Sequence, residues 1–246
     1  MPAERPVALV TGAAKRVGAA IARRLHAAGY DLALHHRHSG ADMAALVAGL
    51  EAARPFSTLV LRAELADAAA LPDLVTATEA HFGRLDALVN NASAFRPTPL
   101  GHATPADWDE LFASNARAPF FLAQAAAPAL RRAGGAIVNL GDIYGERPLA
   151  NHPVYCMAKA ALLMLTQSLA KELGPEVRVN AVAPGAVMWP EEGKAEHEKG
   201  AMLAATALRR AGEPDDVAEA VRWLLQDARY TTGQVIRVDG GRSLNL

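Results

Sequence analysis

Short β-rich runs alternate with long alanine- and leucine-rich stretches along the whole chain, and this alternation limits the fold more than any other feature. The strands are expected at 7–10, 32–34, 58–61, 87–89, 136–140, 177–182 and 234–238. The helical patterns lie near 17–28, 41–53, 68–82, 105–132, 154–173 and 214–227. Strands that alternate with helices in this way predict an α/β domain, in which a seven-stranded, parallel, doubly wound sheet lies between two layers of helices.

The chain is expected to form a single domain over residues 1–246, because its length suits one α/β domain and 51% of its residues are hydrophobic. The segment 186–208 interrupts the alternation, is rich in charged residues and contains Trp189. An insertion of this kind in a compact domain predicts a lid or substrate loop.

The charge balance argues against a nucleic-acid or membrane partner, because 25 basic and 26 acidic residues leave a net charge of −1. No apolar run reaches membrane-spanning length, and the N-terminal residues do not resemble a signal peptide. The single cysteine, Cys156, cannot form an internal disulfide, which fits a reducing compartment. We therefore expect a cytoplasmic protein.

A glycine-containing turn follows the first predicted strand and opens directly into a helix, with Gly12 at the turn and Gly18 in the helix. Such turns bind the pyrophosphate of a dinucleotide, because backbone N–H groups and the helix dipole point toward it. Arg16 stands where the middle glycine of the usual fingerprint would be. The turn predicts a nucleotide site, although an ordinary strand-to-helix connection is the alternative.

The end of the second predicted strand favours NADPH over NADH. A site for NADH places a carboxylate there to bind the ribose hydroxyl, whereas this chain has Arg37 and Ser39, which suit a 2′-phosphate. His35, His36 and His38 lie in the same segment, but no carboxylate or cysteine completes a ligand set, so no metal site is expected.

Tyr155 and Lys159 are four residues apart in a predicted helix and therefore share one face. An ammonium group beside the phenol is expected to lower the tyrosine pKa from about 10 toward neutrality and so to make it a usable acid. Asp142 precedes this pair and places a carboxyl where a carbonyl-reducing site would need a neutral hydroxyl.

Together these features resemble the short-chain dehydrogenase/reductase family over essentially the whole chain. The matching marks are Thr11-Gly12 with Gly18, Asn90-Asn91-Ala92, Asn115, Tyr155 with Lys159, Pro184-Gly185 and Val238-Asp239-Gly240-Gly241. The resemblance implies a Rossmann fold, a nicotinamide cofactor and a homotetramer. It also implies that Tyr155 donates a proton, and that Lys159 binds the nicotinamide ribose and acidifies Tyr155. Cofactor contacts are then expected at Gly12, Arg16, Val17, Gly18, His36, Arg37, Ser39, Glu64, Leu65, Asn91, Ala92, Ser93, Tyr155, Lys159, Pro184, Gly185 and Val187.

The resemblance gives Asn115 a water-binding role in a proton relay. Pro119 lies four residues later and has no N–H to donate to the Asn115 carbonyl, which could leave that oxygen free to bind water. A simple helix kink is the equal alternative.

Three departures from the family pattern are similar to its pteridine reductase branch: Arg16 for the central glycine, Ser93 after Asn91-Ala92, and Asp142 for serine. The resemblance implies that Arg16, Ser93, Phe95, Asp142 and Tyr155 contact the substrate, with Phe95 stacking on a pterin ring. Phe95 could instead pack the loop, Arg16 could contact only phosphate, and Asp142 could be an exposed loop acid.

The chemistry favours reduction of a C=N bond, because a carboxylate beside a developing oxyanion would repel it, whereas a ring nitrogen must gain a proton. The sequence therefore predicts an NADPH-dependent reductase of dihydropterin or dihydrofolate, with Asp142, Tyr155, Lys159 and Asn115 as catalytic residues. A carbonyl or 3-oxoacyl-type reductase is the second hypothesis. A nucleotide-sensing protein without catalysis is the third, and the Tyr155–Lys159 pair argues against it.

Overall fold

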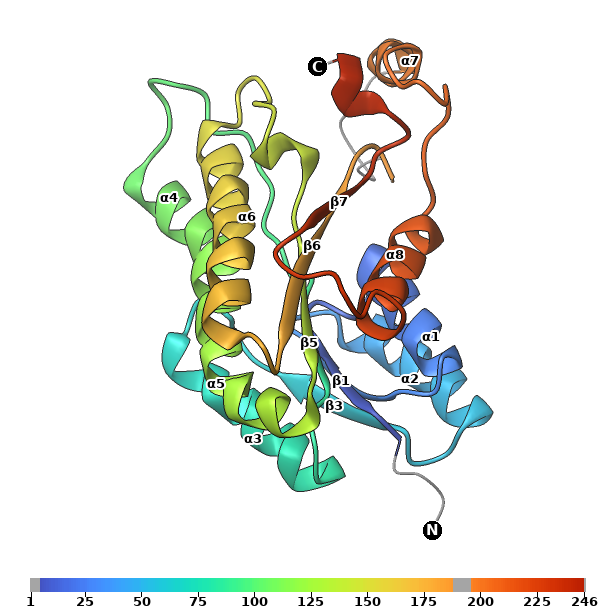
Figure 1. The fold of residues 1–246 in the computed structure, drawn as a ribbon. Helices are drawn as coiled ribbons and strands as arrows, with labels where there is room; N and C mark the ends of the chain where they lie inside the picture. Colours follow the sequence, from blue (N-terminus) through green and yellow to red (C-terminus); the bar gives the residue numbers. More distant parts are fainter. Residues whose placement is uncertain (1–4, 188–195, 246) are drawn as a thin grey trace.

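The computed structural model describes residues 5–187 and 196–245, with side chains described outside 196–199. Its centre is a seven-stranded parallel sheet in the order β3-β2-β1-β4-β5-β6-β7 (Figure 1). The strands are β1 (Val7–Val10), β2 (Asp31–His36), β3 (Thr58–Arg62), β4 (Ala87–Asn90), β5 (Ala136–Leu140), β6 (Arg178–Pro184) and β7 (Val235–Val238). The predicted doubly wound fold is confirmed.

Helices cover both faces of the sheet, as Figure 1 shows. One layer contains α1 (Arg16–Ala27), α2 (Gly40–Ala53) and α8 (Pro214–Gln226). The other contains α3 (Leu71–Phe82), α4 (Pro105–Phe112), α5 (Ala118–Ala133) and α6 (Pro153–Leu173). The helix α7 (Glu196–Ala204) lies beside the C-terminal segment. Short 3₁₀ turns span Ala68–Ala70, Ile143–Gly145 and Arg242–Asn245.

The two faces of the sheet carry separate hydrophobic cores, because successive side chains of a strand point in opposite directions. In β1, Ala8 and Val10 join the core beneath α1, α2 and α8, whereas Val7 and Leu9 join the core beneath α3, α5 and α6. All four side chains are buried, which is typical of a central parallel strand.

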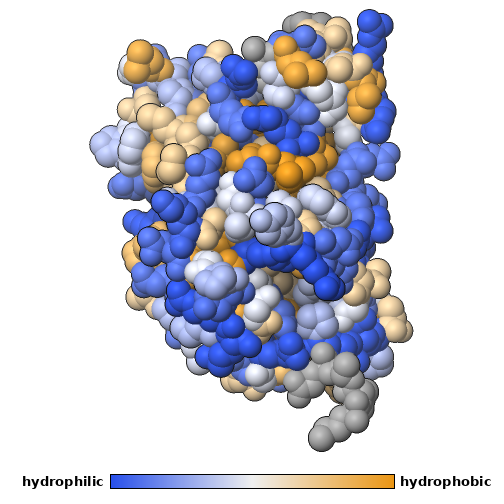
Figure 2. Space-filling view, in the orientation of Figure 1, coloured by the Kyte–Doolittle hydropathy of each residue, from blue (hydrophilic) through white to orange (hydrophobic). Residues whose placement is uncertain are grey.

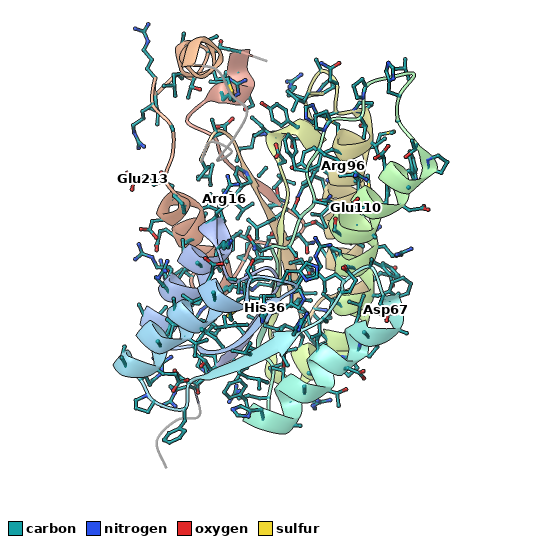
Figure 3. All side chains as sticks on the ribbon, turned by 180° about the vertical axis from the view of Figure 1, so that it is seen from behind. Arg16, His36, Asp67, Arg96, Glu110 and Glu213 are labelled. Carbon is teal, nitrogen blue, oxygen red and sulfur yellow. The ribbon has the colours of Figure 1, made fainter. Side chains whose placement is uncertain are left out.

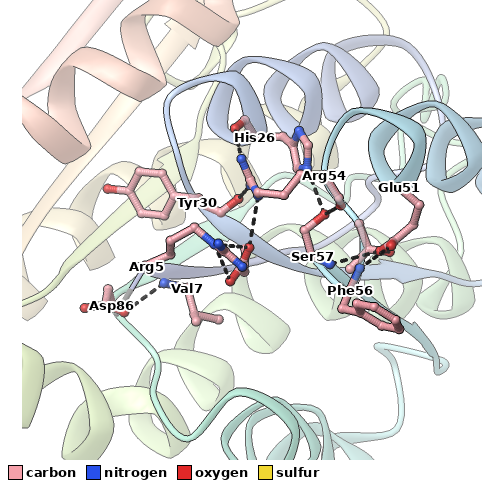
Figure 4. A network of polar contacts seen from close by, with 11 residues as sticks. Arg5, Val7, His26, Tyr30, Glu51, Arg54, Phe56, Ser57 and Asp86 are labelled. Atoms are coloured by element: carbon pink, nitrogen blue, oxygen red, sulfur yellow. Dashed lines mark hydrogen bonds and ion pairs between the residues drawn. The ribbon is translucent and has the colours of Figure 1, made fainter. Parts of the chain in front are cut away.

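Strand β2 is longer than predicted at both ends, because polar residues continue it. Asp31 and His35 are buried, with exposed fractions of 8% and 2%. Asp31 binds Arg5 at 3.0 Å and Arg54 at 3.3 Å, in the polar network drawn in Figure 4. In the same network His26 forms a 2.8 Å hydrogen bond with Ser57. This network ties α1 and α2 to the amino ends of the strands.

The single helix predicted at 105–132 is interrupted. It begins at the predicted cap, where Thr104 and Asp107 form a capping box. It then passes through a π-helical segment, Ala113–Arg117, in which the Ala118 N–H bonds the Ala113 carbonyl. Pro119 lies just beyond and cannot donate to the Asn115 carbonyl. The predicted irregularity is confirmed, and it places Asn115 in the fold interior.

The strand order reverses at β1, whose neighbours are β2 and β4. In open parallel sheets, ligands bind beyond the carboxyl ends of the strands at such a switch point. Figure 2 shows the face of Figure 1 as a mostly hydrophilic surface, with a strip of hydrophobic residues across the half toward which the strands run. Within the described residues, no helix combines the length and the apolar character that crossing a membrane requires.

Candidate functional site

A cavity of about 570 Å³ opens at the switch point, a volume suited to an organic ligand. Its lining extends from the segment after β2, past the glycine turn, to Tyr155 and Lys159 on α6. The order of these parts matches the adenosine ribose, pyrophosphate and nicotinamide portions of a dinucleotide.

The glycine turn is set by close backbone approach. Gly12 has φ +62°, and a Cβ on it would lie 2.9 Å from the Cα of Ala92. A Cβ on Gly18 would lie 2.1 Å from the Gly12 carbonyl oxygen. The Thr11 hydroxyl accepts hydrogen bonds from the N–H groups of Asn91 and Ala92 at 2.9 and 3.0 Å, which joins the turn to the loop after β4.

The start of α1 suits an anion. Its N-cap residue, Lys15, pairs through its side chain with Asp42 at 3.0 Å and does not cap the first-turn amides. Arg16 has φ +51°, the left-handed region that explains why glycine is usual at this position. An arginine held there costs on the order of 1 kcal/mol, which is typical of backbone at functional sites.

The end of β2 brings the predicted cofactor-binding residues into the cavity wall. His36, Arg37 and Ser39 all line it. Figure 3 shows Arg16 and His36 coming from α1 and β2. Arg37 Nη1 lies 3.2 Å from Glu64 Oε2. Partial burial opposes ionisation of Glu64, but the Ala66 N–H and the Arg37 guanidinium hold its pKa below the usual value.

Asp142 and Tyr155 are in direct contact. The Tyr155 hydroxyl donates a 2.7 Å hydrogen bond to Asp142 Oδ2, while Asp142 Oδ1 accepts the Tyr144 N–H at 2.9 Å. The second bond caps the 3₁₀ turn Ile143–Gly145 and thereby fixes the carboxyl toward α6. Asp142 is therefore not an exposed loop acid.

Burial dominates the acid–base properties of this pair. It raises the pKa of Asp142, against the opposing effects of the Tyr144 N–H, the Tyr155 hydroxyl and Lys159. Burial, with the charge and hydrogen bond of Asp142, raises the pKa of Tyr155 well above 10. The expected acidification of Tyr155 by Lys159 is therefore wrong, because burial and the carboxyl determine the direction of the shift.

Lys159 forms the floor of the cavity. It is 2% exposed, and its Nζ donates a 2.8 Å hydrogen bond to the Leu140 carbonyl at the end of β5. Burial lowers its pKa to about 8, and Asp142 opposes that shift. The Nζ atom lies 5.8 Å from the centre of the Tyr155 ring. The predicted shared face is confirmed.

Asn115 acts here through its side chain, which is buried at 1% exposure. Its Nδ2 donates to the carbonyls of Ala94 and Leu111, both at 2.9 Å, and its Oδ1 accepts the Ser93 hydroxyl at 2.7 Å. Asn115 therefore fixes the loop that carries Ser93 and Phe95. The predicted water relay through its carbonyl stays a prediction.

Phe95 lies beside Tyr155. Its ring meets that of Tyr155 edge-to-face, with centroids 4.8 Å apart and an interplanar angle of 88°. It stacks on His152 at 4.7 Å and 13°. Arg96, the next residue, binds Asp107 at 2.9 Å and Glu110 at 2.6 Å and so anchors the loop to α4 (Figure 3). Phe95 is 52% exposed, and its contact with substrate stays a prediction beside the alternative of loop packing.

The structure brings most predicted site residues into one cavity wall. The predicted residues among the lining are Gly12, Arg16, Val17, Gly18, His36, Arg37, Ser39, Glu64, Leu65, Asn91, Ala92, Ser93, Tyr155, Lys159 and Pro184. The predicted residues outside that lining are Asn115, Asp142, Phe95, Gly185 and Val187. Gly185 packs closely on Asp239, and Val187 is buried in the core beneath α8, so a cofactor contact at either residue stays a prediction.

Sequence reasoning missed several lining residues, among them Lys15, His35, Ser114 and Gly141. In the sequence His35 looks like the histidines beside it, for which no metal site is expected. Only its position in the sheet, where it is almost fully buried, distinguishes it. In the predicted lid, Trp189 lies outside the described residues, and the described part includes α7. Whether this segment covers the site stays a prediction.

Comparison with known proteins gives the same family along the whole chain. A family model described as enoyl-(acyl carrier protein) reductase matches residues 12–243. Pteridine reductase 1 of Leishmania tarentolae is 38% identical, over 97% of this chain and 96% of its own length. A putative ketoacyl reductase of granaticin polyketide synthase from Streptomyces violaceoruber is 40% identical, over 98% and 97%. A 3-oxoacyl-[acyl-carrier-protein] reductase of Staphylococcus aureus is 35% identical, over 95% and 96%. The chain belongs to the short-chain dehydrogenase/reductase family.

Proposed function

We propose that this protein is an NADPH-dependent pteridine reductase, which converts a dihydropterin or dihydrofolate to the tetrahydro form. The single observation that carries the proposal is the 2.7 Å contact between the Tyr155 hydroxyl and Asp142. It puts an ionisable carboxyl, rather than a neutral alcohol, against the phenol that lines the cavity.

The residues divide the proton transfer between them. The raised pKa of Tyr155 makes its phenolate costly to form, so this tyrosine needs a second acid that replaces its proton at once. Asp142, whose pKa is also raised, can carry that proton in its neutral form. As Tyr155 turns its proton to the ring nitrogen, its hydrogen bond with Asp142 reverses, so that the neutral carboxyl now donates to the phenol oxygen. The Asp142 proton passes to that oxygen, and the carboxylate is then reprotonated from solvent.

A nicotinamide cofactor fits the cavity, because the uncapped amides of α1 suit its phosphates and Lys159 faces its reactive end. Arg37 and Ser39 would hold the 2′-phosphate of NADPH, and Lys159 the ribose. When bound, the cofactor supplies the hydride. Arg16, Ser93 and Phe95 would complete the substrate contacts. The exposed ring of Phe95 would offer a flat platform to a bicyclic ring, worth about 1 kcal/mol beyond burial.

Reduction of a carbonyl or 3-oxoacyl group is the second candidate. The relatives from Streptomyces violaceoruber and Staphylococcus aureus favour it, because they are about as similar as the pteridine reductase. NADPH oxidation with dihydrobiopterin, dihydrofolate and a panel of ketones and 3-oxoacyl thioesters separates the two. Turnover of ketones or thioesters without turnover of any pterin would reject the proposal.

The pH dependence of turnover tests the role of Asp142. Because the pKa of this carboxyl is raised and its neutral form is the active one, kcat/KM for dihydrobiopterin should fall as pH rises through that pKa. Initial rates between pH 5 and 9 measure this. A profile that rises with pH would contradict the assignment.

Arg37→Ala should weaken NADPH binding about 10- to 100-fold and leave NADH binding unchanged, because a charge-assisted bond to the 2′-phosphate is lost. Cofactor fluorescence titration measures both affinities. Arg23→Ala is the matched control, since Arg23 is exposed on α1 outside the cavity lining and its loss changes the net charge equally. Equal weakening of both cofactors would show that Arg37 does not select between them.

A further inference from the structure

His35 connects two segments that line the cofactor cavity. It is the fifth residue of β2, and its ring is almost fully buried. The Gly12 N–H in the glycine turn lies 3.2 Å from its Nδ1. Its Nε2 lies 3.1 Å from the carbonyl oxygen of Ala63, the residue before Glu64 and Leu65 in the cavity wall. One imidazole therefore bridges the segments that follow β1 and β3.

These two bonds allow a single protonation state. A backbone N–H can only donate, so Nδ1 must be an acceptor and carry no proton. A carbonyl oxygen can only accept, so Nε2 must carry the proton. The neutral Nε2–H tautomer satisfies both partners. A second proton would set two N–H groups against each other at Gly12.

The backbone of His35 reinforces the same connection, because its carbonyl accepts the Ala13 N–H at 2.9 Å. The glycine turn is thus held from β2 by side chain and main chain together. Loss of the side-chain bond would free the Gly12 N–H, whose position is fixed by the close approach to Ala92.

We propose that His35 is a positioning residue whose neutral imidazole holds the glycine turn in its cofactor-binding form, so that dinucleotide binding is linked to deprotonation of His35. The proposal rests on the cofactor part of the proposed function and is independent of the substrate.

The surroundings of His35 favour the neutral form. Burial lowers its pKa, and His36 on the same strand lowers it further, whereas the Ala63 carbonyl and Glu64 after β3 raise it. Glu64 is itself paired with Arg37. On the other side, the glycine turn carries Lys15 and Arg16, and α2 carries Asp42, which pairs with Lys15. The turn should therefore remain intact at neutral pH and loosen in acid.

Two substitutions test the hydrogen bond to the Gly12 N–H and the protonation of the His35 imidazole separately. His35→Phe fills the space but accepts nothing from Gly12, and it should weaken NADPH and NADH binding at pH 7.5 about 10-fold or more. His35→Asn keeps an acceptor at the δ position but cannot titrate, so it should retain most of the affinity. Wild-type affinity should fall at least 3-fold between pH 7.5 and 5, and this fall should be absent in His35→Asn.

Binding is followed by cofactor fluorescence, below the melting temperature of each variant. NADH is measured beside NADPH, because it has no 2′-phosphate to titrate. His26→Asn is the matched control. His26 is also buried, its ring is hydrogen bonded to Ser57, and burial lowers its pKa. It lies, however, at the opposite end of the strands (Figure 4). It should lose stability and keep wild-type affinity for both cofactors.

Wild-type affinity in folded His35→Phe, or a pH dependence unchanged in His35→Asn, would overturn the proposal. If His35→Phe does not fold, the pH comparison between wild type and His35→Asn decides alone. Failure of the wild type to bind either cofactor at pH 7.5 would instead overturn the cofactor assignment and this inference with it.

Discussion

Asp142→Asn should reduce kcat for dihydrobiopterin by about 10²- to 10⁴-fold, the range expected when a general acid is removed. The amide has no acidic proton to return to Tyr155, whose raised pKa leaves its phenolate unstable. Its Oδ1 can still accept the Tyr144 N–H, so the 3₁₀ turn and the cofactor cavity should be preserved. Stopped-flow single turnover with NADPH measures the chemical step, and fluorescence titration should give an unchanged Kd for NADPH.

The matched control is Asp67→Asn. Asp67 also caps a 3₁₀ turn, by accepting the Ala69 N–H at 3.0 Å, but it is exposed and far in sequence from the Tyr155 hydroxyl that Asp142 contacts. It should turn over dihydrobiopterin at the wild-type rate. Turnover by Asp142→Asn within twofold of wild type would remove Asp142 from the mechanism.

Asp142→Asn should also be more stable than wild type at high pH. A carboxyl whose folded pKa is raised stabilises the fold fully below its unfolded pKa of about 4, and that contribution is lost as pH rises through the folded pKa. Removing the ionisable group should therefore raise Tm at pH 8 relative to wild type, and this advantage should disappear at pH 4.

Gly18→Ala should abolish measurable cofactor binding, with at least a 100-fold rise in Kd for NADPH. The new Cβ would lie 2.1 Å from the Gly12 carbonyl oxygen and 2.7 Å from Asn91 Nδ2. Both neighbours are fixed, since Asn91 Nδ2 bonds the carbonyls of Thr11 and Gly12 at 2.9 and 3.0 Å. The start of α1 must then move away from the turn, at a stability cost of about 1–3 kcal/mol.

Gly49→Ala provides the comparison for this prediction. Gly49 lies in α2, where a Cβ meets nothing within 4 Å, so alanine should stabilise the helix by about 1 kcal/mol. Urea unfolding and cofactor titration of both variants distinguish the local clash from a general effect of alanine. Tight NADPH binding by Gly18→Ala would show that the turn tolerates a wider spacing.

The sequence determined the sheet, the helix layers and most of the cavity wall, because these depend on periodicity and on motifs of fixed spacing. It located the ends of strands less well. β2 continues through Asp31 and His35 because the partners of these side chains come from distant segments, which no local pattern indicates. β6 begins one residue late because the Val177 N–H instead bonds the Leu173 carbonyl at the end of α6.

The same limit applies to the site. Spacing alone placed Tyr155, Lys159 and Asp142 together, but the direction of the Tyr155 pKa shift depends on burial and on the carboxyl orientation. The side-chain role of Asn115 arises from the π-helical segment, which turns its amide toward Ser93 and Ala94. His35 was missed because its importance lies in a contact with a backbone N–H.

The carboxyl of Asp142 both caps a turn and contacts the Tyr155 phenol, and this double use has an evolutionary consequence. Serine is an equally good cap, so exchange between aspartate and serine at this position leaves the local fold intact. Exchange at this one position would therefore alter the acidity of the group beside the Tyr155 phenol while the turn that follows β5 keeps its form.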